Sequence, residues 1–392
     1  MPWSETSPMD QKTQFIVDSQ RLGISMTELT ELYNVNRKTG YKWLERYRHL
    51  GPPGLVDRSH RPRNAPNATP KEIVDLLLDA RRRHPSWGGK KLLALIRRGQ
   101  PRLVLPCRGT VCEILARHGM VPEKRVRRRV GHPGRPESGI FAPNDVWSAD
   151  YKGQFRTKDG VYCYPLTVSD NFSRYLLGCQ ALGSTTIVEA KPVFTRLFQE
   201  FGLPTRIRTD NGAPFATCAL GRLSRLSAWW VRLGIMPEFI EPGCPQQNGR
   251  HERMHRTLKA ETTRPPAGSM GAQQRKFNTF RVEFNDVRPH EALDMRTPAS
   301  CHQRSPREMP GKIPPFEYPD RFEVRYVSGN GGIRWDCGWV NISTACIGEN
   351  VGLEEVDNGF WNVYFGSFKL GRLNERTMSI ESQYKKLNPK KV

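Results

Sequence analysis

The sequence predicts a multidomain α/β protein with an all-α N-terminal part, a central mixed α/β layer and a small C-terminal β-barrel. Three observations carry this prediction. Capping signals precede helical apolar patterns before residue 121, β-rich runs alternate with helical ones over 141–300, and short alternating strands with Gly-containing turns fill 316–380. A chain of 392 residues is long enough for several domains.

The composition is strongly basic. Lys and Arg number 61 against 39 Asp and Glu, a formal net charge of +22, which favours a polyanionic partner such as nucleic acid. A ribosomal or merely solvated basic protein stays open at this point. No apolar run has the length of a membrane span and no signal peptide is evident, so we expect no membrane partner and a cytoplasmic protein, nucleoid-associated if the source is bacterial. The nine cysteines form no Cys-x-x-Cys pair, which favours free thiols over a zinc site.

Residues 1–60 predict two consecutive helices. Ser25 and Glu28 match a capping box, in which side chain and backbone exchange hydrogen bonds at a helix start. After a short break, a second helical pattern has Tyr41, Leu44 and Tyr47 on its apolar side. A short helix, a tight turn and a basic amphipathic helix together predict a helix-turn-helix.

The basic side of that second helix predicts contacts with DNA. It would enter the major groove with its first residues facing base edges. The alternative is an ordinary helical hairpin with a solvated basic face. The candidate DNA-binding residues are Asn36, Arg37, Lys38, Lys42 and Arg46.

Residues 61–121 predict a second helical DNA-binding module. Thr69 and Glu72 indicate the start of its first helix, and Thr110 with Glu113 is expected to cap the last of three short helices. A flexible basic linker over 122–140 follows, typical of phosphate contacts that carry no sequence information. Its candidate DNA-binding residues are Lys124, Arg125, Arg127, Arg128 and Arg129.

Residues 141–300 predict the mixed α/β layer. We expect strands at 146–150, 161–168, 175–181, 204–210 and 236–240, and helices after Thr186 and around 223–233. Two of these strands end in a carboxylate, Asp150 and Asp210. Glu252 follows a polar loop and lies in the first turn of a further helix.

Residues 316–380 predict a small antiparallel barrel. Phe322, Val324 and Tyr326 alternate with polar residues, and a Gly-Gly pair and an Asn-Gly turn separate further short runs. A stabilising appendage, a nonspecific DNA contact and an assembly surface are all compatible with this pattern.

Three acids on rigid elements inside a basic chain suit phosphodiester chemistry. Two divalent cations about 4 Å apart can activate the attacking oxygen and stabilise the leaving one, and Mg²⁺ prefers carboxylate oxygens. The alternative for each acid is a surface carboxylate or an ion-pair partner. Asp170 is the nearest rival, but its place across a hairpin predicts a structural role. His251 and His255 flank Glu252 at helical spacing, and their cationic neighbours favour DNA-facing or capping roles over a metal pair.

Several motifs resemble the integrase core of bacterial insertion-sequence transposases and retroviral integrases. They are residues 147–150 (Trp-Ser-Ala-Asp), 209–215 (Thr-Asp-Asn-Gly-Ala-Pro-Phe) and 245–253 (Pro-Gln-Gln-Asn-Gly-Arg-His-Glu-Arg). Residues 284–298 also resemble the stretch that follows this core in insertion-sequence transposases. The 41 residues between Asp210 and Glu252 exceed the usual retroviral interval. Helix-turn-helix modules stand in place of the retroviral zinc module, which favours a transposase.

The resemblance implies a ribonuclease-H-like core, a five-stranded mixed sheet with helices. It also implies a catalytic and metal-binding DDE triad of Asp150, Asp210 and Glu252. Two Mg²⁺ ions would be bound per site, with Asp150 bridging both and Mn²⁺ able to substitute. Water would cleave at the transposon end, and the freed 3′-hydroxyl would attack target DNA. Double-stranded DNA and a homo-oligomer on it are the implied partners, with DNA candidates beside the site at Gln247, Asn248, Arg250, Arg253 and Lys259.

Two other functions stay open. One is a catalytically silent DNA-binding protein derived from a transposase, and the other is a nuclease that cleaves without joining. The intact triad favours the active transposase, because a purely binding role gives no reason to keep three acids in a basic surface.

Overall fold

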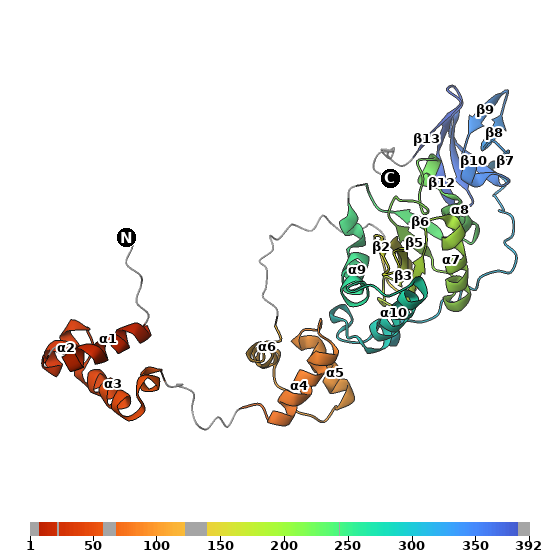
Figure 1. Ribbon diagram of the computed structural model, residues 1–392. Coiled ribbons are helices and arrows are strands. Elements are labelled where there is room, and N and C mark those ends of the chain that lie inside the picture. The colour runs from red at the N-terminus through yellow and green to blue at the C-terminus, as the bar shows by residue number, and fades with distance from the viewer. Residues whose placement is uncertain (1–7, 22, 58–67, 122–138, 243, 383–392) are drawn as a thin grey trace. The chain divides into compact units, whose positions relative to one another are not determined.

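The structure is a computed structural model that describes residues 8–21, 23–57, 68–121, 139–242 and 244–382 (Figure 1). The chain divides into two compact units, Met1–Pro70 and Lys71–Val392. In the described ranges, each helix is too short or too polar to cross a bilayer. The predicted linker contacts at 124–129 lie outside the described residues.

The first unit is built from helices. These are α1 (Pro8–Arg21), α2 (Met26–Leu32), α3 (Arg37–Leu50) and the 3-10 turn η1 (Pro52–Leu55). The capping box predicted before α2 is present: Glu28 N donates to Ser25 Oγ at 3.4 Å, and Ser25 N donates to Glu28 Oε2 at 2.8 Å. Two donors that the helix leaves unpaired are thereby satisfied.

The core of this unit differs from the predicted one at α3. Tyr41 was expected on the apolar side but is exposed, and Trp43 is buried instead, with Leu29 and Leu55. Helix α1, which no sequence pattern predicted, adds Phe15 to the same core. Which residues of α3 are buried therefore depends on packing against α1 as well as on the spacing of apolar residues within α3.

The second unit begins with three helices. These are α4 (Lys71–Arg83), α5 (Gly89–Gly99) and α6 (Arg108–Arg117), packed around Leu77, Trp87 and Leu92. The prediction that Thr110 caps α6 is wrong, because Val111 N already donates to Cys107 O at 3.1 Å. That bond closes the first turn earlier, so Cys107 is the N-cap and Thr110 lies inside the helix.

A mixed sheet forms the centre of this unit. Its strands are β1 (Val146–Tyr151), β2 (Phe155–Arg156), β3 (Tyr162–Asp170), β4 (Leu176–Leu182), β5 (Arg206–Thr209) and β6 (Met236–Phe239). The spatial order is β4-β3-β1-β5-β6, with the short β2 also paired to β3. β1 is antiparallel to β3 and parallel to β5, and β5 is parallel to β6. The predicted five-stranded mixed sheet is thereby confirmed, with β2 as an addition.

Helices cover both faces of this sheet. α7 (Ile187–Phe201) and α8 (Arg225–Arg232) pack on the face that carries Trp147, Ala149 and Val168. α9 (Gly249–Thr262) and α10 (Met270–Val282) pack on the other face, against Cys163 and Leu176. Since side chains alternate along a strand, Ser148 and Asp150 point toward the face covered by α9.

Short turns lead from α10 to the last domain. They are the π-helical turn η4 (Glu283–Val287) and the 3-10 turns η5 (Glu291–Leu293) and η6 (Pro298–Ser300). Two further 3-10 turns, η2 (Leu220–Arg222) and η3 (Pro245–Asn248), precede α8 and α9.

The C-terminal region is antiparallel β structure. A five-stranded sheet has the order β13 (Ser379–Ser382), β12 (Phe368–Asn374), β11 (Phe360–Phe365), β10 (Asn350–Asp357), β7 (Phe322–Tyr326). β8 (Gly332–Trp335) and β9 (Gly338–Asn341) form a separate hairpin, and the 3-10 turn η7 (Thr344–Cys346) follows it. In the described residues no ladder joins β7 to β13, so the predicted barrel is not confirmed.

Candidate active site

Sheet topology brings the first two acids to one edge. Asp150 lies near the end of β1, and Asp210 directly follows β5. These strands are parallel neighbours in the register Ser148↔Arg208, which places positions 150 and 210 opposite each other two residues further on. Gly212 N donates to Asp210 Oδ1 at 3.1 Å and fixes that carboxylate at the start of its turn.

The third acid is electrostatically close to the first. Burial, together with the negative charges of Asp210 and Glu252, raises the pKa of Asp150 to about 7. Burial also raises the pKa of Asp210. Glu252, in the first turn of α9, is exposed. A cation would relieve this repulsion on Asp150, and carboxylate oxygens are ligands that suit a hard divalent ion.

Two histidines of α9 are buried near Asp150. His251 and His255 are 1% and 5% exposed, so the interpretation of DNA-facing or capping roles is wrong. They belong to the buried stripe of α9 with Met254 and Leu258, at the spacing i, i+3, i+4, i+7. That spacing was the available sequence signal for their burial.

Both histidines bond to one threonine hydroxyl. Thr167 Oγ1 lies 2.7 Å from His251 Nε2 and 2.6 Å from His255 Nε2, and it donates to Asp150 O at 3.0 Å. A hydroxyl has one proton and two lone pairs, so both Nε2 atoms must donate to it. The Ser169 hydroxyl lies 2.8 Å from His251 Nδ1 and therefore donates to it.

Burial keeps these rings neutral. It lowers the pKa of His251 to about 3 and that of His255 to about 2, the latter also through the neighbouring His251. The remaining ring nitrogen, His255 Nδ1, is 3.6 Å from Asp150 Oδ2. Ligand atoms of Asp150, His251 and His255 all lie within 4.8 Å of one another, and this arrangement was not predicted.

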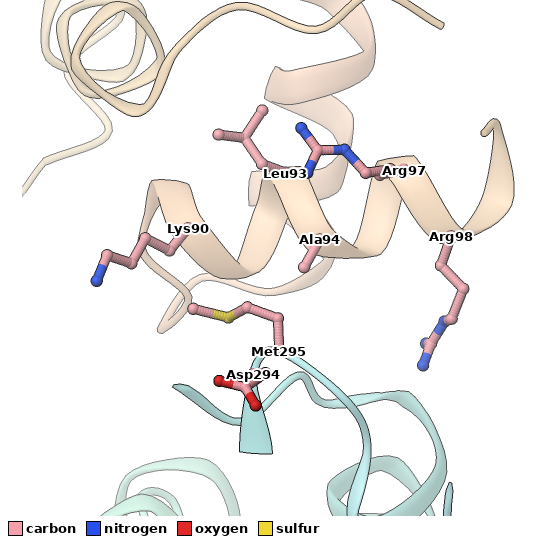
Figure 2. A pocket seen from close by; sticks show the side chains of 7 residues that line it. All are labelled: Lys90, Leu93, Ala94, Arg97, Arg98, Asp294 and Met295. Carbon is pink, nitrogen blue, oxygen red and sulfur yellow. The ribbon is translucent and has the colours of Figure 1, made fainter. Parts of the chain in front are cut away.

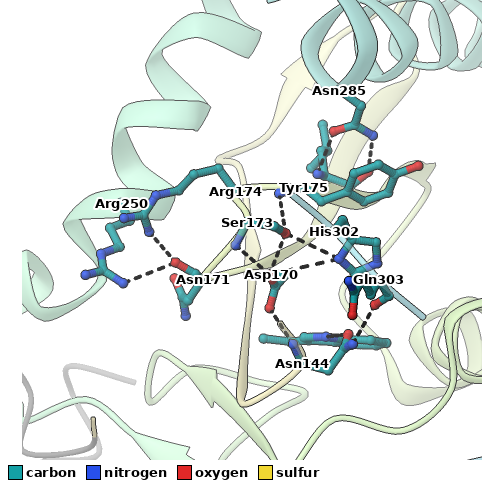
Figure 3. A network of polar contacts seen from close by, with 12 residues as sticks. Asn144, Asp170, Asn171, Ser173, Arg174, Tyr175, Arg250, Asn285, His302 and Gln303 are labelled. Atoms are coloured by element: carbon teal, nitrogen blue, oxygen red, sulfur yellow. Dashed lines mark hydrogen bonds and ion pairs between the residues drawn. The ribbon is translucent and has the colours of Figure 1, made fainter. Parts of the chain in front are cut away.

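Asp170 belongs to a separate buried network (Figure 3). Its carboxylate accepts from Asn144 N at 3.0 Å and from Ser173 N at 2.7 Å and Oγ at 2.5 Å, and His302 Nδ1 lies 4.0 Å away. The side chain has no exposed surface. Its contacts fix the β3–β4 turn to the segment before β1, consistent with the structural role predicted for it.

Arginines converge next to the α9 N-terminus. Arg174 and Arg250 both donate to the carbonyl of Asn171, Arg250 at 3.2 Å (Figure 3). Burial, together with the charges of Arg250 and Arg253, lowers the pKa of Arg174 to about 10. Three guanidinium groups thus lie close together near the start of α9. Arg174 was missed, because only the folded turn brings it to α9.

The other predicted contacts near the site differ in exposure. Gln247 Oε1 accepts from Glu241 N at 2.9 Å, so its side-chain oxygen is already used within the loop. Asn248 is only 5% exposed, so little of its side chain is accessible to DNA. In the described residues, Asn248 Oδ1 has no hydrogen-bond partner. Arg253 and Lys259 are exposed on α9.

In the first unit, the predicted DNA-binding residues cluster on α3. Asn36 caps the helix by accepting from Lys38 N at 2.9 Å, which commits its side-chain oxygen. Lys42 and Arg46 lie over the ring of the buried Trp43, each 4.9 Å from its centroid. Arg37 is exposed at the first position of α3.

A hollow along α5 gathers further positive charge (Figure 2). Lys90, Arg97 and Arg98 line its α5 side, and Asp294 and Met295 lie across from them. The pairs Lys90-Lys91 and Arg97-Arg98 were the available sequence signal.

Comparison with protein families decides what kind of core this is. Residues 142–245 match the integrase core domain, and a second integrase core family matches 233–298. The chain carries an integrase core. Residues 11–63 match a helix-turn-helix domain and residues 39–115 a homeodomain-like domain. The predicted resemblance to insertion-sequence DDE transposases is confirmed by these domains and by the relatives.

The relatives come from insertion elements and retroviruses. An uncharacterized 39.2 kDa protein of insertion element IS476 from Xanthomonas euvesicatoria is 26% identical over 212 residues, 51% of this chain and 52% of that protein. The Pol polyprotein of radiation murine leukemia virus (strain Kaplan) is 27% identical over 199 residues, 50% of this chain and 32% of the polyprotein. The chain thus spans about half or less of these relatives.

Among solved structures, the HTLV-2 integrase catalytic core in complex with magnesium is similar over 41% of this chain and 98% of that chain. The sequence identity is 17% and the TM-score is 0.34.

The buried network around Asp170 predicts that replacing Asp170 lowers the stability of the fold and leaves Mg²⁺ binding unchanged. Asp170→Ala leaves the buried donors of Asn144 and Ser173 unpaired, which we expect to lower the free energy of unfolding by about 1–3 kcal/mol. Urea denaturation measures this, with the exposed Asp320→Ala as the matched control. Unchanged stability together with lost Mg²⁺ binding would instead make Asp170 a ligand.

The raised pKa of Asp150 predicts a pH-dependent stability. The pKa in the folded protein, about 7, lies above the ordinary value of 3.8, so the folded state holds the proton longer and loses stability as pH rises between these values. Asp150→Asn removes this loss. In chelator, we expect the variant to gain on the order of 1–3 kcal/mol relative to wild type between pH 5 and pH 8. Thermal unfolding at both pH values measures it, and parallel pH profiles would contradict it.

Proposed function

We propose that this protein is a DNA transposase, a DDE-type polynucleotidyl transferase that cleaves transposon ends and joins them to target DNA. The observation that carries the proposal is the parallel pairing of β1 with β5, which brings Asp150 and Asp210 to one edge of the sheet, where the charges of Asp210 and Glu252 both act on Asp150. Three carboxylates gathered in a chain of net charge +22 are unfavourable without a ligand that they share. The integrase core and the insertion-element relatives support the same function.

In this proposal the triad binds two Mg²⁺ ions, with Mn²⁺ able to substitute. Asp150, Asp210 and Glu252 would hold these ions. The bound ions would lower the barrier by activating the attacking oxygen and stabilising the leaving one. Asp150 and Asp210 are held by the sheet and Glu252 by α9, so the chain positions the reacting groups on rigid elements.

The reaction proceeds in two displacements at phosphorus. Water first attacks the phosphodiester at the transposon end, and a 3′-hydroxyl leaves. That hydroxyl then attacks a target phosphodiester in line, forming one phosphodiester bond as another breaks. The number of such bonds is conserved in the second step, so joining needs no external energy source.

DNA is the proposed partner at several surfaces. The helix-turn-helix units at 1–60 and 61–121 would bind the transposon ends, and the linker at 122–140 would contact phosphates. The core at 141–300 would hold the scissile strand beside Arg250 and Arg253. Because two ends must be joined to one target, we place the protein as a homo-oligomer on DNA, in the cytoplasm or at a bacterial nucleoid.

A DNA-binding derivative without catalysis is the alternative. Its helix-turn-helix units would bind the same ends, but no bound metal would then offset the repulsion among the three acids. A nuclease that cleaves without joining shares the site and differs only in its product.

A strand-transfer assay tests the proposed activity. Wild type with Mg²⁺ and labelled end DNA should yield joined product, whereas Asp150→Asn, Asp210→Asn and Glu252→Gln should each lose it by at least about 10³-fold, because each removes a metal ligand. Binding of the same DNA should stay near wild type in all three. Bound DNA without product from wild type, in Mg²⁺ and in Mn²⁺, would favour the silent derivative.

End recognition is tested separately. Changing both Arg37 and Lys38 to Ala should weaken binding to the transposon end by about 1–3 kcal/mol for each hydrogen-bonded base that the variant no longer reads, yet leave joining of a saturating pre-cut end intact. Competition binding against unrelated DNA measures the difference. Equal affinity for the end would move recognition to the module at 61–121.

A further inference from the structure

We propose that Nδ1 of His255 ligates the divalent cation held by Asp150, which gives this position a nitrogen ligand and a preference for a transition-metal ion such as Mn²⁺ over Mg²⁺. The inference rests on the proposed function only in that Asp150 binds a metal. It adds a fourth residue to the acids of the triad.

The hydrogen bonds of Thr167 fix the direction of the imidazole. Its single proton goes to the carbonyl of Asp150, so both of its lone pairs accept from histidine Nε2 atoms. His255 therefore carries its proton on Nε2, and its Nδ1 has a bare lone pair. That lone pair faces Asp150 Oδ2 at 3.6 Å.

Two electron-rich atoms that face each other at this distance are unfavourable, and a positive partner between them relieves this. A carboxylate oxygen and an imidazole lone pair repel each other, and either a shared proton or a cation removes the repulsion. A metal with ligand bonds of about 2.0–2.2 Å to each atom spans such a gap. Asp150 and His255 offer ligand atoms within 4.8 Å of each other, close enough to share one ion.

The neighbouring histidine does not compete for this role. His251 Nδ1 accepts from the Ser169 hydroxyl at 2.8 Å, and its Nε2 donates to Thr167 at 2.7 Å. Both of its nitrogens are thereby used. Of the two buried imidazoles, His255 alone directs an unused lone pair at a carboxylate.

The helix brings a second ligand to the same side. Glu252 and His255 are three residues apart on α9, a spacing that places them on one face of the helix. Glu-x-x-His on a helix is also the ligand pattern of carboxylate-bridged two-metal sites in helical bundles. Thr167 supplies the outer contact, since metal-bound imidazoles usually donate their other N–H to a nearby acceptor that orients the ring.

Pulsed electron paramagnetic resonance of Mn²⁺ bound to the full-length protein tests the assignment. A nitrogen ligand couples its nuclear spin to the manganese, whereas oxygen ligands do not. We expect ¹⁴N coupling in wild type, no ¹⁴N coupling in His255→Gln, and unchanged coupling in the exposed His49→Gln. Asp150→Asn must lose the bound Mn²⁺ itself, which assigns the signal to this site.

Calorimetric titration gives a second readout. His255→Gln should weaken Mn²⁺ binding about tenfold, equal to about 1.4 kcal/mol, and change Mg²⁺ binding by less than about threefold. Bound Mn²⁺ without ¹⁴N coupling in wild type would overturn the proposal and favour a proton shared by Asp150 and His255. That result needs no variant to fold and leaves the proposed transposase standing. Failure of wild type to bind Mn²⁺ better than Asp150→Asn would overturn both.

Discussion

The hydroxyl of Thr167 joins the two layers on which the candidate site depends. It donates to the backbone of β1 at Asp150 and accepts from both buried histidines of α9, so a strand and a helix share one hydrogen-bonding centre. Apolar packing alone would hold α9 on the sheet without fixing its register, because it is not directional, whereas three hydrogen bonds to one oxygen set both distance and orientation. Glu252 follows His251 directly, and its position relative to the sheet acids follows from this anchor.

The central sheet could be predicted because its signals are local. β-rich runs, the acids at the ends of β1 and β5 and the helix caps all lie within short windows of sequence. The misses depend on partners distant in sequence. Whether Tyr41 or Trp43 of α3 is buried depends on α1, which no local pattern marked. Closure of a barrel depends on pairing between the first and last strands, and alternation along each strand does not specify it.

The candidate site divides in the same way. Asp150, Asp210 and Glu252 could be located because the motifs around them are contiguous in sequence. The charges flanking His251 and His255 indicate exposure, but the apolar residues Met254 and Leu258 at helical spacing mark the same side of α9 as buried. The approach of Arg174 to Arg250 follows from the conformation of the β3–β4 turn, which is a tertiary property.

The C-terminal strands share a hydrophobic core with the catalytic layer. Ala228 and Val231 of α8, with Phe239 of β6, are buried together with strand residues such as Val351 and Leu370. Trp230 of the same helix is buried on the opposite side, against the sheet. A fragment ending after the last integrase-like motif would therefore expose an apolar strip along α8 and tend to self-associate. The sequence motifs end near residue 300, but the folding unit continues beyond them. Exchange of the C-terminal strands between related proteins in evolution would therefore require a matching apolar surface on α8 and β6.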